Sequence, residues 1–190
     1  MERHADNYYI EKIRLGETGC FAPILERYGV QVFSLIVKIV GNREDAEELT
    51  QDVFVKAFRS LSSFRGDSSF STWIYRIAYN LAVSAARKKK MDFVPVDESV
   101  LSDVPDEPDE TMLGTADTDE RLACLHLALE QLTPEERAMI MLFYKDSKSM
   151  EEIAVITGLT ETNVKTKIFR IRKKLFVLIK AMEQKEDETE

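Results

Sequence analysis

The sequence predicts an all-α protein in which two small helical domains are joined by a flexible acidic linker. Apolar residues recur three and four positions apart through both ends of the 190-residue chain, which is the spacing of amphipathic helices. No stretch alternates with the period of two that marks a strand. Between the ends, residues 92–120 hold 11 acids, no lysine or arginine and three of the five prolines, a composition typical of an extended linker.

The first domain, residues 1–91, shows three helical patterns. We expect helices at about residues 22–40, 45–61 and 71–90. Gly41 and Asn42 stop the first of them, because both residue types favour helix ends. The second opens with an acidic turn, which suits the positive end of a helix dipole. Residues 64–69 lie between the second and third helices, and their composition is that of a loop.

The second domain, residues 120–183, has four helical patterns with clear start signals. We expect helices at about residues 119–131, 133–144, 149–158 and 160–182. Thr133 and Ser149 each stand three residues before a glutamate, which is the spacing of a capping box. A short capped helix that ends at Gly158 and precedes a longer basic helix is typical of a helix-turn-helix.

The last predicted helix has two distinct faces. Its apolar positions follow spacings of 4, 3, 4 and 3, which predicts a buried stripe of Val164, Ile168, Ile171, Leu175 and Leu178. The opposite face carries Thr162, Lys165, Thr166, Phe169, Arg170 and Lys173. Lysine and arginine reach guanine edges and phosphates in the major groove. Threonine can contact either of these, and phenylalanine can lie against a thymine methyl group. This favours DNA binding over the alternative of a solvated basic face.

Composition excludes several functional classes. The net charge of -8 divides into +3 for residues 1–91, -11 for the linker region, +4 for residues 121–182 and -4 for residues 183–190. Cys20 and Cys124 are too far apart for a CxxC pair, and the chain has only two histidines, so we expect no metal and no cofactor. No apolar run approaches the ~20 residues of a membrane span. A cytoplasmic protein with an acidic tail over residues 184–190 is expected.

Five segments match, in order, the motifs of one known family. They cover residues 41–54, 64–80, 132–137, 151–154 and 163–175. Through these segments the chain resembles the extracytoplasmic-function (ECF) group of bacterial RNA polymerase sigma factors, in the sigma-70 superfamily. The resemblance implies a four-helix region 2 domain at residues 1–91, a linker at residues 92–119 and a four-helix region 4 domain at residues 120–183.

The resemblance implies a role in transcription initiation rather than an enzymatic activity. Such a chain binds core RNA polymerase and carries it to the -10 and -35 elements of a promoter. It binds the promoter DNA first as a duplex and then in its melted form. Two elements separated by about 16 base pairs lie ~55 Å apart at 3.4 Å per base pair. A further implied partner is an anti-sigma factor that masks the chain until a signal arrives. The linker and tail acids are expected to compete with DNA phosphates in the free protein.

The resemblance also assigns a docking segment. It places six residues on the clamp helices of the largest polymerase subunit: Asp45, Glu48, Leu49, Gln51, Asp52 and Phe54. The apolar members of this set would serve equally well in the core, so that alternative stays open for them. For Val53 and Phe58 of the same helix we expect a core position.

Promoter contacts are implied in both domains. The -10 residues are Phe64, Arg65, Asp67, Ser68, Arg76, Asn80, Arg87 and Lys88. Phe64 would stack on a flipped base and Asn80 would read its edge, although Phe64 could instead anchor its loop in the core. The -35 residues are Thr162, Lys165, Thr166, Lys167, Phe169, Arg170 and Lys173. Positions 165 and 167 hold lysine where the family would have arginine. Because lysine lacks the fork with which arginine grips guanine, the promoter sequence cannot be predicted from this helix.

Two other classes remain as alternatives. One is a helix-turn-helix regulator that acts without docking on core polymerase, and the other is an RNA-binding adaptor. An enzyme is the least favoured class, because the sequence has no catalytic triad, metal cluster or glycine-rich phosphate loop. Residues 41–80 distinguish the classes, since a simple regulator has no use for a docking and base-capture segment.

Overall fold

The computed structural model describes residues 2–89 and 118–187, and every regular element in these ranges is helical. The all-α prediction is therefore confirmed. The first part contains α1 (Glu2–Arg14), η1 (Thr18–Phe21), α2 (Ala22–Val40), α3 (Arg43–Ser60), η2 (Leu61–Ser63) and α4 (Phe70–Lys88). The second contains α6 (Thr118–Glu130), α7 (Pro134–Ile140), η4 (Met141–Lys145), α8 (Met150–Thr157) and α9 (Glu161–Asp187). Most of the predicted linker lies outside the described residues.

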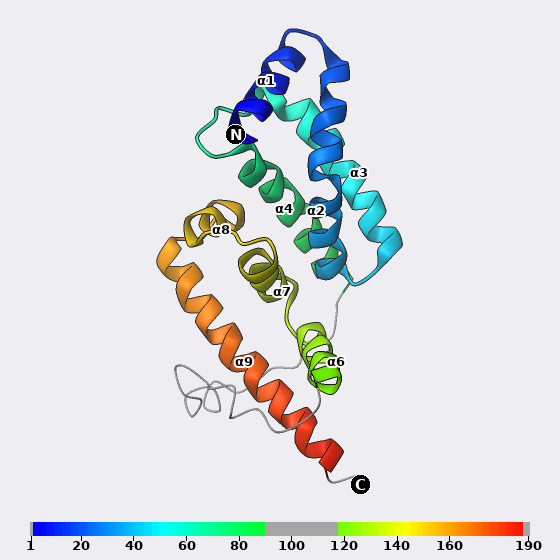
Figure 1. The fold of residues 1–190 in the computed structure, drawn as a ribbon, viewed down its shortest axis with the longest axis vertical. Coiled ribbons are helices and arrows are strands. Elements are labelled where there is room, and N and C mark those ends of the chain that lie inside the picture. Colours follow the sequence, from blue (N-terminus) through cyan, green and yellow to red (C-terminus); the bar gives the residue numbers. More distant parts are fainter. Residues whose placement is uncertain (1, 90–117, 188–190) are drawn as a thin grey trace.

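Helices α2, α3 and α4 pack against one another and form the core of the N-terminal domain (Figure 1). Their ends follow the sequence signals closely. Gly41 ends α2 with a φ of 71°, a left-handed conformation that glycine adopts without strain. Asn42 caps α3 by accepting a hydrogen bond from the Asp45 amide at 2.9 Å, and Ser69 caps α4 through the Thr72 amide at 3.1 Å.

Helix α1 is the α-helix in residues 2–89 that periodicity does not predict. A buried carboxylate attaches it to α2: Asp6 pairs with Arg27 and accepts a 2.5 Å hydrogen bond from the Tyr28 hydroxyl. A buried charge needs such partners, because desolvation would otherwise cost several kcal/mol. Among the described side chains of α1, Ile10 and Ile13 are buried in the apolar core and Tyr9 packs against it, which is too short a stripe to stand out in the sequence. With α1, the domain has the four helices that the resemblance implies.

The stretch Thr18–Val40, which includes α2, is long and apolar enough to cross a membrane by length and composition. It exceeds the apolar runs identified from the sequence alone. One side of α2 nevertheless supplies the centre of the domain core, with Val32, Ile36 and Ile39 fully buried. We therefore interpret it as a core helix.

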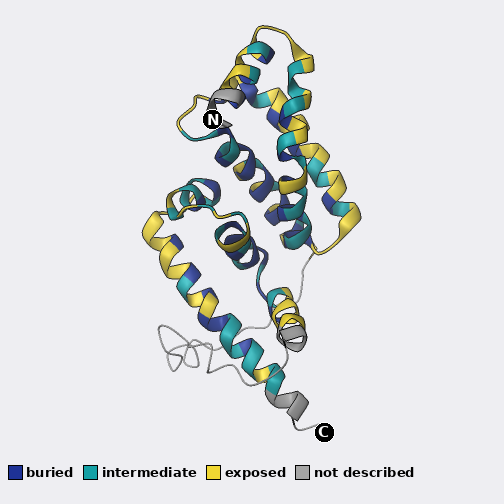
Figure 2. Ribbon diagram, viewed as in Figure 1, coloured by how far each residue is buried: buried dark blue, intermediate teal, exposed yellow. Residues whose placement is uncertain are grey.

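The C-terminal domain has the predicted helix-turn-helix. Capping boxes open α7 at Thr133 and α8 at Ser149, each with both reciprocal hydrogen bonds. Gly158 ends α8 with a φ of 75° and turns the chain into α9. The predicted stripe of α9 is largely buried, while the first turns of that helix are exposed (Figure 2). Helix α9 extends to Asp187, beyond the expected end near residue 182.

The two domains contact each other directly. Helix α8 packs on α4, and α7 packs on α2 and α4, so that buried residues of both domains form one apolar cluster (Figure 1). Arg137 of α7 lies at this junction and is buried. Its guanidinium donates to the carbonyl of Lys38 in α2 at 3.2 Å and to the carbonyls of Glu130 and Leu132. Burial lowers the pKa of Arg137, so these hydrogen bonds compensate the cost of its charge.

Replacement of Arg137 by alanine should destabilise the chain by about 2–4 kcal/mol, because three buried or part-buried carbonyl groups lose a charged donor. Urea denaturation at neutral pH measures this change. The exposed Arg59 of α3 is a matched control, and Arg59→Ala should leave the unfolding midpoint nearly unchanged. Equal midpoints for the two variants would contradict the structural role of Arg137.

Candidate polymerase- and promoter-binding surfaces

The exposed side of α3 is acidic. Glu44, Glu48 and Asp52 are spaced four residues apart, so they form one stripe, which we call the acidic face. Gln51 lies beside it and is also exposed. A shallow hollow of about 380 Å³ adjoins Asp52. Val55, Leu81 and the aliphatic parts of Lys56 and Arg59 give it a largely apolar surface, with Ser60 and the charged groups of Asp52, Lys56 and Arg59 also in its lining. Acidic groups beside an apolar hollow suit a basic protein partner that also buries apolar side chains.

The predicted docking residues separate into exposed and buried ones. Glu48, Gln51 and Asp52 are exposed, whereas Phe54 is buried in the core and Leu49 is half-buried. Asp45 is partly exposed and forms an ion pair with Lys89 at the end of α4. Val53 is buried as expected, but Phe58 is partly exposed and its ring lies 5.2 Å from that of Phe21. A partner that approaches α3 can therefore reach its exposed polar residues, whereas Phe54 is covered by the core.

A second polar face runs along α4. Arg76, Asn80 and Arg87 are exposed and, at intervals of four and seven residues, lie on one side of the helix. Lys88 follows at its end and is also exposed. Cations and an amide in a line can contact consecutive phosphates and a base edge of one strand. The four -10 residues predicted on α4 are therefore brought together.

The loop of residues 64–69 is fixed at both ends. The Phe64 ring is 7% exposed and packs against Phe70 and Trp73, with ring centres 5.5 and 5.3 Å apart. In this structure Phe64 anchors the loop in the core. It does not stand free to stack on a base. Between the fixed ends, Arg65 and Asp67 are exposed and Ser68 is half-buried. These three polar side chains of the loop are accessible to a ligand.

Arg14 is a residue of this site that the sequence analysis missed. Its guanidinium donates to the backbone carbonyls of Leu61 and Phe64, just before the loop. Helix α1 thereby holds the start of the loop from a distance of about 50 positions in the sequence. A single arginine in a surface helix has no sequence signature that distinguishes it from a solvated one, so only the structure reveals this contact.

Arg14→Ala should weaken recognition of the -10 element about tenfold, because the loop loses two charged hydrogen bonds. Arg14→Lys should recover little of this loss, since an ammonium lacks the fork that reaches two carbonyls. The measurement is binding of single-stranded -10 oligonucleotides to the chain in complex with core polymerase. Lys12→Ala, on the same helix, is the control and should have no effect. Unchanged base preference in Arg14→Ala would contradict this role.

The start of α9 presents the predicted -35 residues. Thr162, Lys165, Thr166 and Lys167 are exposed, and so is Arg170 one turn further on. In a helix-turn-helix, the first turns of the second helix enter the major groove. The Thr166 hydroxyl donates to the Thr162 carbonyl at 3.0 Å, but its oxygen keeps acceptor capacity. This exposed polar surface fits the expected contact with DNA.

Phe169 and Lys173 differ from the rest of the -35 set. Phe169 is half-buried, and the Lys173 ammonium lies 4.7 Å from the centre of its ring. Lys173 is only 8% exposed, whereas the face pattern predicts an exposed cation. The side chain crosses the helix surface to reach the aromatic face, where a cation is attracted by the ring quadrupole. Lys173 therefore supports Phe169 in this structure.

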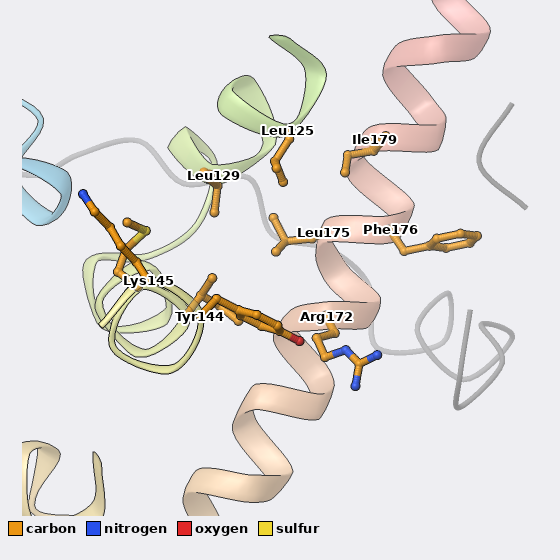
Figure 3. Close-up of a pocket in the computed structure, with 10 residues that line it drawn as sticks. Leu125, Leu129, Tyr144, Lys145, Arg172, Leu175, Phe176 and Ile179 are labelled. Carbon is orange, nitrogen blue, oxygen red and sulfur yellow. The ribbon is translucent and has the colours of Figure 1, made fainter. Parts of the chain in front are cut away.

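An apolar groove lies between α6, η4 and α9, and the sequence analysis did not identify it. Its volume is about 450 Å³, and Leu125 and Leu129 face Leu175 and Ile179 across it (Figure 3). Tyr144 lies at one end of the groove and is exposed. Arg172 stands at the rim; the Lys145 stem also lines the groove, but its ammonium points away and donates to the Ser34 hydroxyl of α2. The groove can hold an apolar side of another helix, with an acidic residue opposite Arg172.

Comparison with known proteins decides the family. The sigma-70 region 2 family matches residues 24–91, and the sigma-70 region 4 family matches residues 122–175. The chain is 32% identical to the ECF RNA polymerase sigma-E factor of Escherichia coli over 182 residues, which is 90% of this chain and 92% of that protein. This chain belongs to the ECF sigma factors. It is an alternative sigma factor that directs transcription initiation, as the resemblance implied.

Other relatives of this sigma factor have the same extent. RNA polymerase sigma-H factor of Pseudomonas aeruginosa is 30% identical over 183 residues, with 90% of this chain and 92% of the relative covered. ECF sigma factor SigW of Bacillus subtilis is 30% identical over 172 residues, with 87% and 92% covered. The similarity spans both domains, so the family assignment does not depend on the helix-turn-helix alone.

Two solved structures share the fold of this sigma factor. One is CnrH in complex with the cytosolic domain of CnrY, with a TM-score of 0.68, 24% identity, and 93% of this chain and 98% of that chain covered. The other is RpoE in complex with the anti-sigma factor NepR from Bartonella quintana, with a TM-score of 0.58, 23% identity, and 84% and 96% covered. Two helical domains in this order are therefore the fold of the family.

Proposed function

We propose that this sigma factor binds core RNA polymerase through the acidic face of α3 and recognises its promoter with α4 and α9. The observation that carries the proposal is the acidic face beside an apolar hollow, in the same chain as a capped helix-turn-helix. A regulator that only binds DNA has no need of such a face. The proposed domains are residues 1–91 and 120–183, with the linker of residues 92–119 between them.

Docking is assigned to the exposed residues Glu48, Gln51 and Asp52, with Asp45 at the edge. Carboxylates on a rigid helix provide charge complementarity to a basic partner, which raises the association rate and fixes the register of the complex. The buried Phe54 and the half-buried Leu49 support the helix from within. The chain acts in the cytoplasm, with the polymerase supplying the bond-forming chemistry.

The -10 element is assigned to the loop of residues 64–69 and the polar face of α4. Arg65, Asp67 and Ser68 have donors and acceptors for the edge of a flipped base. Asn80, on the helix α4 that follows the loop, adds a side-chain amide. Arg76, Arg87 and Lys88 would follow the phosphates of the same strand. Phe64 is assigned to holding the loop in place, and its burial in the core supports this role.

The -35 element is assigned to the first turns of α9. Lys165, Thr166 and Arg170 are placed toward base edges, with Phe169 against a thymine methyl group. Thr162 and Lys167 are placed toward phosphates. Lys173 is assigned to orienting Phe169 by the cation–π contact. Phosphate contacts set the position of the helix, and the base contacts set its preference.

An anti-sigma factor is a further proposed partner. The apolar groove between α6, η4 and α9 supports this proposal, because an amphipathic helix with an acidic residue beside its apolar side would fit both its walls and Arg172 at its rim. Of the two structural neighbours, RpoE was solved in complex with the anti-sigma factor NepR, and CnrH in complex with the cytosolic domain of CnrY. Arg172→Glu would weaken such a partner without touching the proposed DNA residues.

Promoter-specific transcription with purified core polymerase tests the proposed function. The chain should co-purify with the core enzyme and support initiation from a promoter that the core alone does not use. Permanganate footprinting should detect opening of the -10 region in this complex. A chain that binds promoter DNA tightly by itself but leaves the core enzyme inactive would instead be a helix-turn-helix regulator, and a preference for structured RNA would indicate the adaptor.

A further inference from the structure

Helix α9 carries three cations in a line that leads from the proposed -35 residues into the domain. Lys167, Arg170 and Lys174 follow one another at intervals of three and four positions, so they lie on one side of the helix. All three line the same cleft, together with residues of α7. Lys167 and Arg170 are exposed, whereas Lys174 is only 8% exposed. Spacing alone would assign all three cations to DNA, and burial sets Lys174 apart.

The buried ammonium of Lys174 is paired with a carboxylate of α7. Its Nζ donates to Oε2 of Glu136 at 2.9 Å, across 38 positions of the sequence. A buried cation that has exchanged its water for one carboxylate must break that pair before it can reach a phosphate group. The pair therefore joins α9 to α7 within the C-terminal domain.

Glu136 is held in place by the start of α7. The Thr133 amide donates to the same Oε2 atom at 2.9 Å, and the Glu136 amide donates to the Thr133 hydroxyl oxygen at 3.2 Å. These are the two hydrogen bonds of the capping box, so the carboxylate that receives Lys174 is already fixed by its own helix. The ion pair thus attaches α9 to a rigid point.

Contacts of two kinds hold α9 in its domain. The helix packs on α8 near its start and on α7 and α6 further along (Figure 1). Its apolar residues Val164, Ile168 and Ile171 are buried, but apolar contacts do not depend on direction. A hydrogen bond from an ammonium to one carboxylate oxygen depends on both distance and angle. The pair of Lys174 and Glu136 therefore restricts rotation and sliding of α9 more narrowly than the apolar stripe does.

The proposed base contacts lie on the same rigid helix. Arg170 is one turn before Lys174, and Lys165 is nine residues before it, which is about 14 Å at 1.5 Å per residue. A rotation or slide of α9 moves both side chains together. Hydrogen bonds to base edges tolerate little displacement, so such a movement changes which bases the helix favours.

We propose that Lys174 is a positioning residue for -35 recognition: its ion pair with the capping glutamate of α7 sets the rotation of α9 and thereby the base preference of Lys165 and Arg170. The proposal rests on the proposed function, because it takes the -35 role of α9 from there. Its own content is that an ion pair inside the domain contributes to the choice of promoter sequence. The competing interpretation is that Lys174 is a phosphate contact, as its place in the line of cations suggests.

Lys174→Met and Glu136→Gln break the pair from its two sides. Methionine retains an unbranched apolar stem, and glutamine still serves in a capping box, so α7 keeps its start signal. Both variants should lower the preference for the best -35 element over its single-base variants about fivefold, because the base contacts are misaligned. Quantitative footprinting of the full chain in complex with core polymerase measures this preference. It is a ratio for one protein, so a smaller folded fraction cancels in it.

Salt dependence and a double variant separate positioning from phosphate contact. A phosphate contact predicts that Lys174→Met lowers the salt dependence of binding by about one unit of slope. Positioning predicts an unchanged slope. It also predicts that the double variant Lys174→Met, Glu136→Gln loses no more base preference than either single variant, because the two residues act through one pair.

Glu135→Gln is the matched control. Glu135 is the neighbouring acid of α7 and lines the same cleft, but it pairs with Arg87 of α4 rather than with α9. This variant removes the same charge from the same turn, and it should keep the parent's base preference at every position of the -35 element.

The outcomes distinguish this proposal from the proposed function. Parent-like base preference in either Lys174→Met or Glu136→Gln would overturn the positioning role, and so would a reduced salt slope in Lys174→Met. Additive losses in the double variant, or an equal loss in Glu135→Gln, would overturn it as well. If the parent complex itself shows no base preference within the -35 element, the proposed function of α9 is wrong, and the positioning role falls with it.

Discussion

Asp52→Lys is expected to weaken binding of the chain to core RNA polymerase by about 30-fold or more. Asp52 is the position at which the acidic face meets the apolar hollow, so a docked partner would desolvate it. Removing one member of a desolvated charge pair typically costs ~2–5 kcal/mol, and reversal adds repulsion. Fluorescence titration of labelled chain with core polymerase measures the affinity, and promoter-specific transcription should fall in parallel.

The matched control for Asp52→Lys is Glu26→Lys. Glu26 is an exposed acid of α2 in the same domain, so the change in net charge is identical. A non-specific electrostatic effect would weaken both variants alike, and it would vanish at moderate salt because exposed charges are screened. Wild-type affinity in Asp52→Lys would exclude α3 as the docking helix. Gln51→Ala should show a smaller loss, because it removes a neutral hydrogen-bonding group.

Lys165→Ala and Arg170→Ala are each expected to reduce use of a -35-dependent promoter about tenfold or more. Both side chains are exposed on the first turns of α9, and a good base contact is worth ~1–3 kcal/mol. Arg170→Ala should also relax the base preference at one position of the element. Quantitative footprinting on a set of single-base promoter variants, with the complete polymerase complex, measures both effects.

Two further variants separate base contacts from phosphate contacts. Lys167→Ala should weaken binding to all sequences alike and lower the salt dependence of binding by about one unit of slope. Lys180→Ala is the control on the same helix; the residue lies 19 positions after the start of α9, or about 28 Å at 1.5 Å per residue. The -35 assignment fails if Arg170→Ala blocks opening on a promoter without -35 dependence.

The sequence predicted most helices of this protein because their end signals are local. Ser149 caps α8 and Gly158 ends it through interactions within five residues, so the capping box and the glycine turn could be read directly from the chain. Helix α1 was missed because a single buried carboxylate, Asp6, attaches it to α2. Its partners Arg27 and Tyr28 follow 21 and 22 positions later, and no periodicity marks such a contact.

The site residues were predictable to different degrees. Residues on regular helices, such as Asp52 and Arg170, have the exposure that their spacing predicts. The position of Phe64 could not be predicted from its residue type. An aromatic residue in a loop can stack on a base or pack in the core, and both roles use the same apolar ring. Lys173 has a long side chain that reaches Phe169, so its placement depends on a neighbour rather than on its own face.

The sequence alone determined the all-α class, the order of the two domains, the capped helix-turn-helix and the family. The helices and their ends depend on interactions along one helix or across one turn, which local sequence spacing predicts. The family follows from five motifs that occur in the right order along the chain. The tertiary structure decided the support of the -10 loop by Arg14, the apolar groove beside α9 and the interdomain contacts of Lys148. The hydrogen bonds of Arg14 to Leu61 and of Lys148 to Ser71 join residues 47 and 77 positions apart, and the groove likewise joins separate helices, so only tertiary packing brings these residues together.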